Sequence, residues 1–124
     1  MRTLAGLCLA ALVCLPGAAV AQSSGDWVLS QWKGSSQYFP GVVQKREGNS
    51  VWVLFDDGTR EVRPANLLRP FDWRAGSRVE CRWTDGSWYP GRITFMGADG
   101  ATLDVLYDDG DRQRTNTGRC RTPG

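Results

Sequence analysis

The sequence predicts an all-β protein made of two small antiparallel barrels in tandem. Short segments in which apolar and polar residues alternate indicate strands, and tight turns, most of them containing Asp-Gly, separate these segments. No stretch shows sustained helical periodicity. Three short motifs also occur twice in the same order along the chain, which indicates a structural repeat.

The repeat consists of a strand that ends in Trp, an aromatic-Pro-Gly segment and an aromatic-Asp-Asp-Gly segment. These motifs occupy residues 28–32, 38–43 and 51–58 in the first copy, and residues 79–83, 88–93 and 103–110 in the second. Each copy has about 45 residues, which is few for an independent core. The junction between the copies, residues 70–76, is short and carries Phe71 and Trp73. We therefore expect the two halves to pack together, since this composition differs from that of a flexible linker.

The individual elements follow from the alternation and from the turn residues. In the first copy we expect strands at residues 27–33, 38–46, 50–56 and 59–63, and a short helical turn over residues 64–68. In the second copy we expect strands at residues 78–84, 87–96, 101–108 and 111–115. The connecting turns are Gly48-Asn49, Asp57-Gly58, Asp85-Gly86, Asp99-Gly100 and Asp109-Gly110. Paired Asp residues can also bind calcium or serve acid–base chemistry, but Asp before Gly is ordinary hairpin chemistry, and we favour the turns.

The first 21 residues have the pattern of a secretory signal peptide. Met1-Arg2 gives a short positive start, residues 4–15 are almost wholly apolar, and Ala19-Val20-Ala21 offers small residues for cleavage after Ala21. We expect an exported protein, periplasmic or secreted, with no membrane span in the mature chain. A lipoprotein is the weaker interpretation, because neither Cys8 nor Cys14 follows the small residue that lipidation normally requires.

Two cysteines, Cys81 and Cys120, remain in the mature chain at matched positions of the repeat, in the first strand and in the closing segment. In an oxidising compartment they can form a disulfide, and two buried thiols are the alternative. A bond between them would close a loop of about 40 residues and add roughly 3–4 kcal/mol of stability.

Charge and composition exclude several kinds of function. Fifteen Lys+Arg against 13 Asp+Glu give a formal net charge of +2, so we do not expect nucleic acid as a partner. The chain has no His, which removes Ser-His-Asp and Cys-His catalysis, and two Cys cannot complete a structural zinc site. We expect neither an enzyme nor a cofactor or metal. The arginines of the C-terminal region, interpreted as a solvated strand face rather than a small anion-binding patch, are Arg112, Arg114, Arg119 and Arg121.

The second copy resembles a Tudor domain, and it is similar to the plant agenet branch of that superfamily. The resemblance is carried by residues 79–93, with Trp, Asp-Gly and Tyr-Pro-Gly in order, and by the Tyr-Asp-Asp-Gly that ends at residue 110. The first copy resembles a weaker second example, and together they cover residues 27–121. The resemblance implies two SH3-like five-stranded barrels, at residues 22–69 and 77–124, joined by the junction at residues 70–76.

Members of this superfamily commonly bind methylated lysine or arginine in an aromatic cage. The resemblance places Trp83, Tyr89 and Tyr107 at cage positions, with Asp109 near the rim. The matching residues of the first copy are Trp32, Phe39 and Phe55, with Asp57 as the counterpart of Asp109. A fourth aromatic residue that many cages use is missing, since residues 110–113 and 58–61 contain none.

The resemblance implies a non-catalytic binding module with a partial aromatic cage. Its partner would be a protein or peptide with a methylated or otherwise cationic side chain. Two other functions stay open: a structural or protein-interaction domain of the cell envelope, and a binder of wall polymers. The same aromatic residues would also serve to fill the core of such small barrels.

Overall fold

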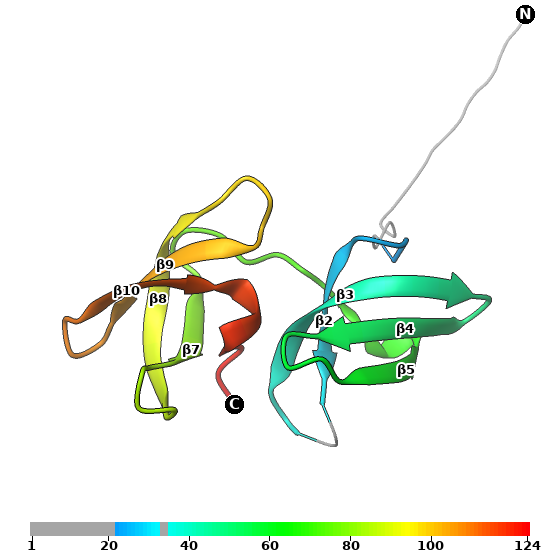
Figure 1. Ribbon diagram of the computed structural model, residues 1–124, viewed down its shortest axis with the longest axis horizontal. Coiled ribbons are helices and arrows are strands. Elements are labelled where there is room, and N and C mark those ends of the chain that lie inside the picture. The colour runs from blue at the N-terminus through cyan, green and yellow to red at the C-terminus, as the bar shows by residue number, and fades with distance from the viewer. Residues whose placement is uncertain (1–21, 33–34) are drawn as a thin grey trace, which may run out of the picture.

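The computed structural model describes residues 22–32 and 35–124, and this part of the chain is all-β with two antiparallel sheets, as predicted (Figure 1). The predicted signal peptide lies outside the described residues. The two five-stranded sheets have equivalent strand orders, β5-β4-β3-β2-β6 and β10-β9-β8-β7-β11. We call the first unit barrel 1 (residues 22–70) and the second barrel 2 (residues 77–121).

Each barrel has four longer strands and a two-residue closing strand that follows a single 3-10 turn. Barrel 1 contains β2 (Trp27–Gln31), β3 (Tyr38–Glu47), β4 (Ser50–Phe55), β5 (Arg60–Pro64), η3 (Ala65–Leu67) and β6 (Arg69–Pro70). Barrel 2 contains β7 (Arg78–Arg82), β8 (Trp88–Met96), β9 (Thr102–Tyr107), β10 (Arg112–Asn116), η4 (Thr117–Arg119) and β11 (Cys120–Arg121). The closing strands pair with the first strand of each barrel, so each sheet is bent back on itself.

The predicted Asp-Gly turns are present in both barrels. Gly58, Gly86, Gly100 and Gly110 all have positive φ, between 73° and 96°. The preceding Asp side chain accepts a hydrogen bond from the backbone amide two residues later at each turn, for example Asp85 from Ser87 at 2.9 Å. These contacts are the ordinary hairpin chemistry of Asp before Gly.

Strand alternation places one row of side chains in each core. Val51, Val53 and Phe55 of β4 are buried, whereas Trp52 lies on the outer face with the Lys45 ammonium 4.3 Å from its ring centroid. Leu103, Val105 and Tyr107 of β9 are buried in the same way in barrel 2. This is the period of two that a strand with one buried face requires.

Gly91 of the aromatic-Pro-Gly motif lies where two strands approach each other closely. It pairs with Tyr107 across the sheet, and a Cβ at this position would lie 2.7 Å from the carbonyl oxygen of Leu106 and 2.9 Å from Val105 Cγ1. Gly41 holds the equivalent position in barrel 1, opposite Phe55. The motif therefore has a packing role that is independent of any ligand.

We predict that Gly91→Ala destabilises barrel 2, because the neighbouring atom is backbone and cannot rotate away. The expected loss in the free energy of unfolding is roughly 1–3 kcal/mol. Chemical denaturation measures it, with Arg92→Ala, the exposed next residue of the same strand, as the control. Equal stability of the two variants would contradict the close approach.

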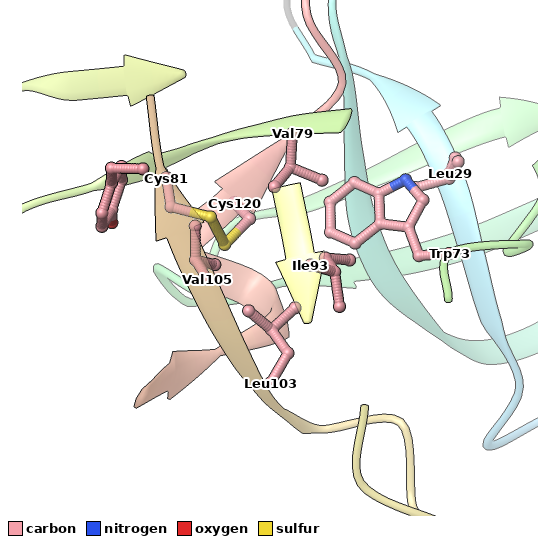
Figure 2. Close-up of a cluster of buried hydrophobic side chains, with 9 residues drawn as sticks. Leu29, Trp73, Val79, Cys81, Ile93, Leu103, Val105 and Cys120 are labelled. Carbon is pink, nitrogen blue, oxygen red and sulfur yellow. A yellow bond between two sulfur atoms is a disulfide. The ribbon is translucent and has the colours of Figure 1, made fainter. Parts of the chain in front are cut away.

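The two barrels share an aromatic contact in which Trp73 is buried and Trp27 and Phe71 are partly buried. The Trp27 and Phe71 ring centroids are 5.6 Å apart, and those of Phe71 and Trp73 are 5.4 Å apart. Leu29 of barrel 1 lies in the same buried cluster as Trp73 and the inner side chains of barrel 2 (Figure 2). The short aromatic junction thus joins the two halves as packed neighbours.

The C-terminal segment forms a second contact between the barrels. The Thr122 amide donates to the Tyr38 carbonyl oxygen at 2.9 Å, and the Tyr38 amide donates to Thr122 Oγ1 at 2.7 Å. Gly118 lies against Asp56 so closely that a Cβ on Gly118 would be 2.4 Å from Asp56 Cβ. Residues after β10 therefore belong to the interface as well as to barrel 2.

Cys81 and Cys120 form a disulfide that ties β11 to β7. Their sulfur atoms are 2.03 Å apart, their Cα atoms are 4.1 Å apart, and the two residues are directly opposite each other in the ladder. Both are fully buried (Figure 2). The bond secures a closing strand that is only two residues long.

Candidate functional site

One pocket of about 220 Å³ contains the four residues that the resemblance places at the cage of barrel 2. We call it the cage pocket; its lining residues are Trp83, Asp85, Tyr89, Tyr107, Asp109 and Asp111. Three aromatic rings and three carboxyl groups are thus brought together, and no basic side chain is among these lining residues. Such a lining suits a cation.

Strand ends and turns position these side chains. Trp83 follows β7, Tyr89 lies on β8 and Tyr107 ends β9. The carboxyl groups come from the two turns at the same end of the sheet, Asp85 from the β7–β8 turn and Asp109 and Asp111 from the β9–β10 turn. Because β7, β8 and β9 are neighbours in the antiparallel sheet, residues far apart in sequence meet at one rim.

The three rings differ in exposure. Tyr107 is 3% exposed and forms part of the core, and its hydroxyl donates to Gln113 Oε1 at 2.5 Å. Tyr89 is 39% exposed, and Trp83 is half-buried. The Trp83 and Tyr107 rings meet edge to face, with centroids 5.5 Å apart and planes at 89°. The cage pocket therefore has two solvent-accessible rings, Trp83 and Tyr89, and a third ring, Tyr107, that is buried in the core.

A hydrogen bond joins one of the accessible rings to a carboxylate. The Tyr89 hydroxyl donates to Asp85 Oδ2 at 2.6 Å, while Asp85 Oδ1 accepts from the Ser87 amide at 2.9 Å. This bond raises the pKa of Tyr89 above its ordinary 10.0 and lowers the pKa of Asp85 below its ordinary 3.8. The hydrogen bond contributes to folding stability at pH values above the ordinary carboxyl pKa. This contribution is lost as the pH falls through the lowered pKa of Asp85.

We predict that Asp85→Asn lowers the pKa of Tyr89 toward 10.0, because the variant removes both the charged acceptor and its field. NMR detection of the tyrosine Cζ signals during an alkaline titration measures this. Asp109→Asn is the control, since Asp109 acts on Tyr89 only through space and contributes least to its shift. An unchanged Tyr89 titration in Asp85→Asn would contradict the hydrogen bond.

The matching residues of barrel 1 lie in a different setting. Trp32, Phe39, Phe55 and Asp57 line a pocket of about 250 Å³ between the barrels, with one wall from barrel 2. We call it the junction pocket; its full lining is Trp32, Phe39, Pro40, Phe55, Asp56, Asp57, Arg82, Trp88, Gly118, Arg119 and Arg121. The Phe39 and Trp88 rings meet edge to face at 5.9 Å. The first copy therefore forms a composite site with barrel 2, whereas the cage pocket belongs to barrel 2 alone.

The C-terminal arginines do not form one surface. Arg114 pairs with Asp104 at 2.7 Å and Arg121 pairs with Glu80 at 2.9 Å. Arg119 lines the junction pocket, and Arg112 is exposed. Arg112 and Arg114 thus lie on one exposed face of β10, as expected, whereas Arg119 and Arg121 lie at the junction pocket and not on that face.

Two further properties of the described residues bear on function. No group of three acidic or sulfur-bearing side chains within residues 22–32 and 35–124 is arranged to hold a metal ion. In that same part of the chain, no helix has both the length and the apolar character to cross a bilayer.

The sequence pattern identified part of the cage pocket and missed two of its acidic residues. From the sequence, Asp85 is assigned only to the Asp85-Gly86 turn, and Asp111 only to the expected strand at residues 111–115. The sequence did contain one indication that Asp85 belongs to the pocket: Asp85 lies two residues after Trp83, in the turn that leads to Tyr89. The barrel 2 wall of the junction pocket had no local signal, because it depends on how the barrels pack.

Two solved structures of tandem Agenet domains are similar to this chain. The crystal structure of ADCP1 tandem Agenet domain 3-4 is similar at 19% identity, covering 82% of this chain and 80% of that one, with a TM-score of 0.36. The Arabidopsis thaliana AGDP1 AGD34 crystal structure is similar at 18% identity, covering 82% of each chain, with a TM-score of 0.37. No protein-family model and no curated protein matches the sequence. At these TM-scores no residue role is carried over from either structure.

Proposed function

We propose that this protein is an exported, non-catalytic binding module whose cage pocket takes a methylated ammonium or guanidinium group of a protein or peptide. The observation that carries the proposal is the lining of the cage pocket, in which three rings meet three carboxyl groups without a basic side chain. A methylated cation keeps its charge, is hydrated less well than an unmodified one, and is attracted by the faces of aromatic rings.

The geometry indicates weak binding. Each cation–π contact contributes about 0.5–2 kcal/mol, and only Trp83 and Tyr89 offer accessible faces. The carboxylates of Asp85 and Asp109 add attraction at the rim. We expect dissociation constants on the order of 0.1–1 mM for an isolated ligand group, so that a natural partner would add contacts outside the pocket.

The test compares matched peptides that differ in one side chain. Trimethyllysine, dimethyllysine, dimethylarginine and unmodified lysine peptides are titrated while NMR follows the indole and backbone signals of Trp83. The control peptide carries a neutral side chain in which carbon replaces the quaternary nitrogen. We expect Trp83 to respond to at least one methylated cation and not to the neutral control. No response to any cation, or equal responses to cation and control, would overturn the proposal.

Export is part of the same proposal and has its own support. The leader pattern of residues 1–21 predicts secretion, and a disulfide such as Cys81–Cys120 persists mainly in oxidising compartments. Fractionation of cells that express the chain, followed by N-terminal sequencing, tests it. We expect a mature protein outside the cytoplasm that begins at Gln22, and an uncleaved cytoplasmic chain would overturn this part.

A further inference from the structure

The junction pocket has two walls of opposite charge. Barrel 1 supplies the carboxyl groups of Asp56 and Asp57, and barrel 2 supplies the guanidinium groups of Arg82, Arg119 and Arg121. Aromatic side chains also line the pocket: Trp32, Phe39 and Phe55 from barrel 1 and Trp88 from barrel 2. Two of these rings already contact arginines, because the guanidinium carbon of Arg82 lies 5.6 Å from the Trp88 centroid and that of Arg121 lies 5.8 Å from the Phe39 centroid. The pocket therefore exists only when both barrels are present and packed together.

The interface leaves charged groups on both walls without ion pairs. Arg121 is held in place by Glu80 at 2.9 Å and lies over the Trp88 ring, with its guanidinium carbon 4.2 Å from the centroid. In contrast, Asp56, Arg82 and Arg119 make no ion pair with any residue of the described ranges 22–32 and 35–124. Charges that served only to join the barrels would be expected to pair across the contact.

From this arrangement we infer that the junction pocket binds a small zwitterion that carries a methylated ammonium and a carboxylate. The ammonium would lie against the rings near Asp56, where cation–π attraction and a carboxylate act together. The carboxylate would meet Arg119 and Arg82, since guanidinium groups form strong, directional hydrogen bonds with carboxylates.

Charge complementarity excludes simpler ligands. A cation without a carboxylate would be repelled by the arginine wall, and an anion without an ammonium would be repelled by Asp56. A ligand with both charges meets an opposite charge on each wall. The volume of about 250 Å³ is below the usual range for ligand pockets of about 300–1,000 Å³, so it suits a compact molecule.

The two pockets share no lining residue. The inference is thus independent of the cation site in barrel 2, and either can fail without the other.

The experiment uses three probes of nearly equal size with the purified protein. Glycine betaine carries both charges, choline carries only the quaternary ammonium, and 3,3-dimethylbutanoate has carbon in place of the betaine nitrogen and carries only the carboxylate. NMR follows the indole signals of Trp32 and Trp88, and calorimetry gives the affinities. We expect betaine to bind at least tenfold more tightly than either single-charge probe and to shift the Trp32 and Trp88 signals. Equal affinity of choline or of dimethylbutanoate for this pocket, or no response of these signals to betaine, would overturn the inference.

Variants that remove a single charge test which wall of the junction pocket binds which end of betaine. Arg119→Gln is expected to weaken betaine binding about tenfold and to leave choline binding unchanged or stronger, and Arg82→Gln is the second variant if the first is unstable. Asp56→Asn is expected to weaken betaine binding and to leave dimethylbutanoate unchanged or stronger. Arg112→Gln, an exposed arginine outside the pocket, is the control. Betaine affinity that is equal in wild type, Arg119→Gln and Arg82→Gln would overturn the inference.

Discussion

Trp83→Ala is expected to weaken the binding of methylated peptides to the cage pocket roughly thirtyfold. Trp83 supplies the ring with the strongest attraction for a cation and stands edge to face against Tyr107 at 5.5 Å. Its loss removes one of two accessible faces and opens the pocket to water. With starting dissociation constants on the order of 0.1–1 mM, a loss of about 2 kcal/mol raises them roughly thirtyfold, to about 3–30 mM. NMR titration with the best methylated peptide measures the effect, followed in both proteins through the backbone signals of Asp85 and Tyr89, which also line the pocket.

The controls separate ligand binding from packing. Trp83 also touches the core of barrel 2, so part of its effect on stability is independent of ligand. Tyr89→Ala removes a more exposed ring and is expected to weaken binding roughly tenfold while the barrel stays folded. Trp52→Ala, on the outer face of β4 beside Lys45, removes a Trp outside both pockets and is expected to leave binding unchanged. Full binding by a folded Trp83→Ala protein would contradict the cage.

Local chemistry explains which parts of the fold could be predicted. Asp-Gly turns require positive φ at the glycine and supply a side-chain acceptor, so Asp85-Gly86 and Asp109-Gly110 determine where the strands reverse. Alternation then identifies the buried face, as in β4 and β9. The closing strands β6 and β11 have two residues each, too few for any alternation. Only the family resemblance indicated a fifth strand.

The site shows the same division between local and tertiary information. Trp83, Tyr89 and Tyr107 were grouped by the repeat and the resemblance, and the structure brings them to one rim. The burial of Tyr107 could not be predicted, because alternation gives a side chain's face but not how far a small barrel covers its end. The junction pocket depends on contacts such as Phe39 with Trp88 and Thr122 with Tyr38. These contacts arise from the packing of the two barrels, for which the sequence has no local pattern.

The Cys81→Ala, Cys120→Ala double variant is expected to lose about 4 kcal/mol of stability. The bond closes a loop with a sequence separation of 39, and the loss of this constraint increases the entropy of the unfolded chain. The melting temperature should fall by roughly 15–30 °C. Chemical and thermal denaturation measure both quantities. Barrel 1 has Ser30 and Leu68 at the matched positions, so the variant removes no covalent bond from barrel 1. The indole NMR signal of Trp52 reports on the folding of barrel 1 separately.

The same variant should affect the interface, because Arg121 and Thr122 directly follow Cys120. Arg121 reaches Glu80 and the Trp88 ring, and Thr122 bonds to Tyr38 of barrel 1. A two-residue strand without its disulfide has few contacts to hold these residues in place. We therefore expect faster amide exchange at Thr122 and altered Trp88 signals at temperatures where barrel 2 is still folded. Unchanged stability, or Thr122 protection equal to that of the wild type, would show that the closing strand is held by packing alone.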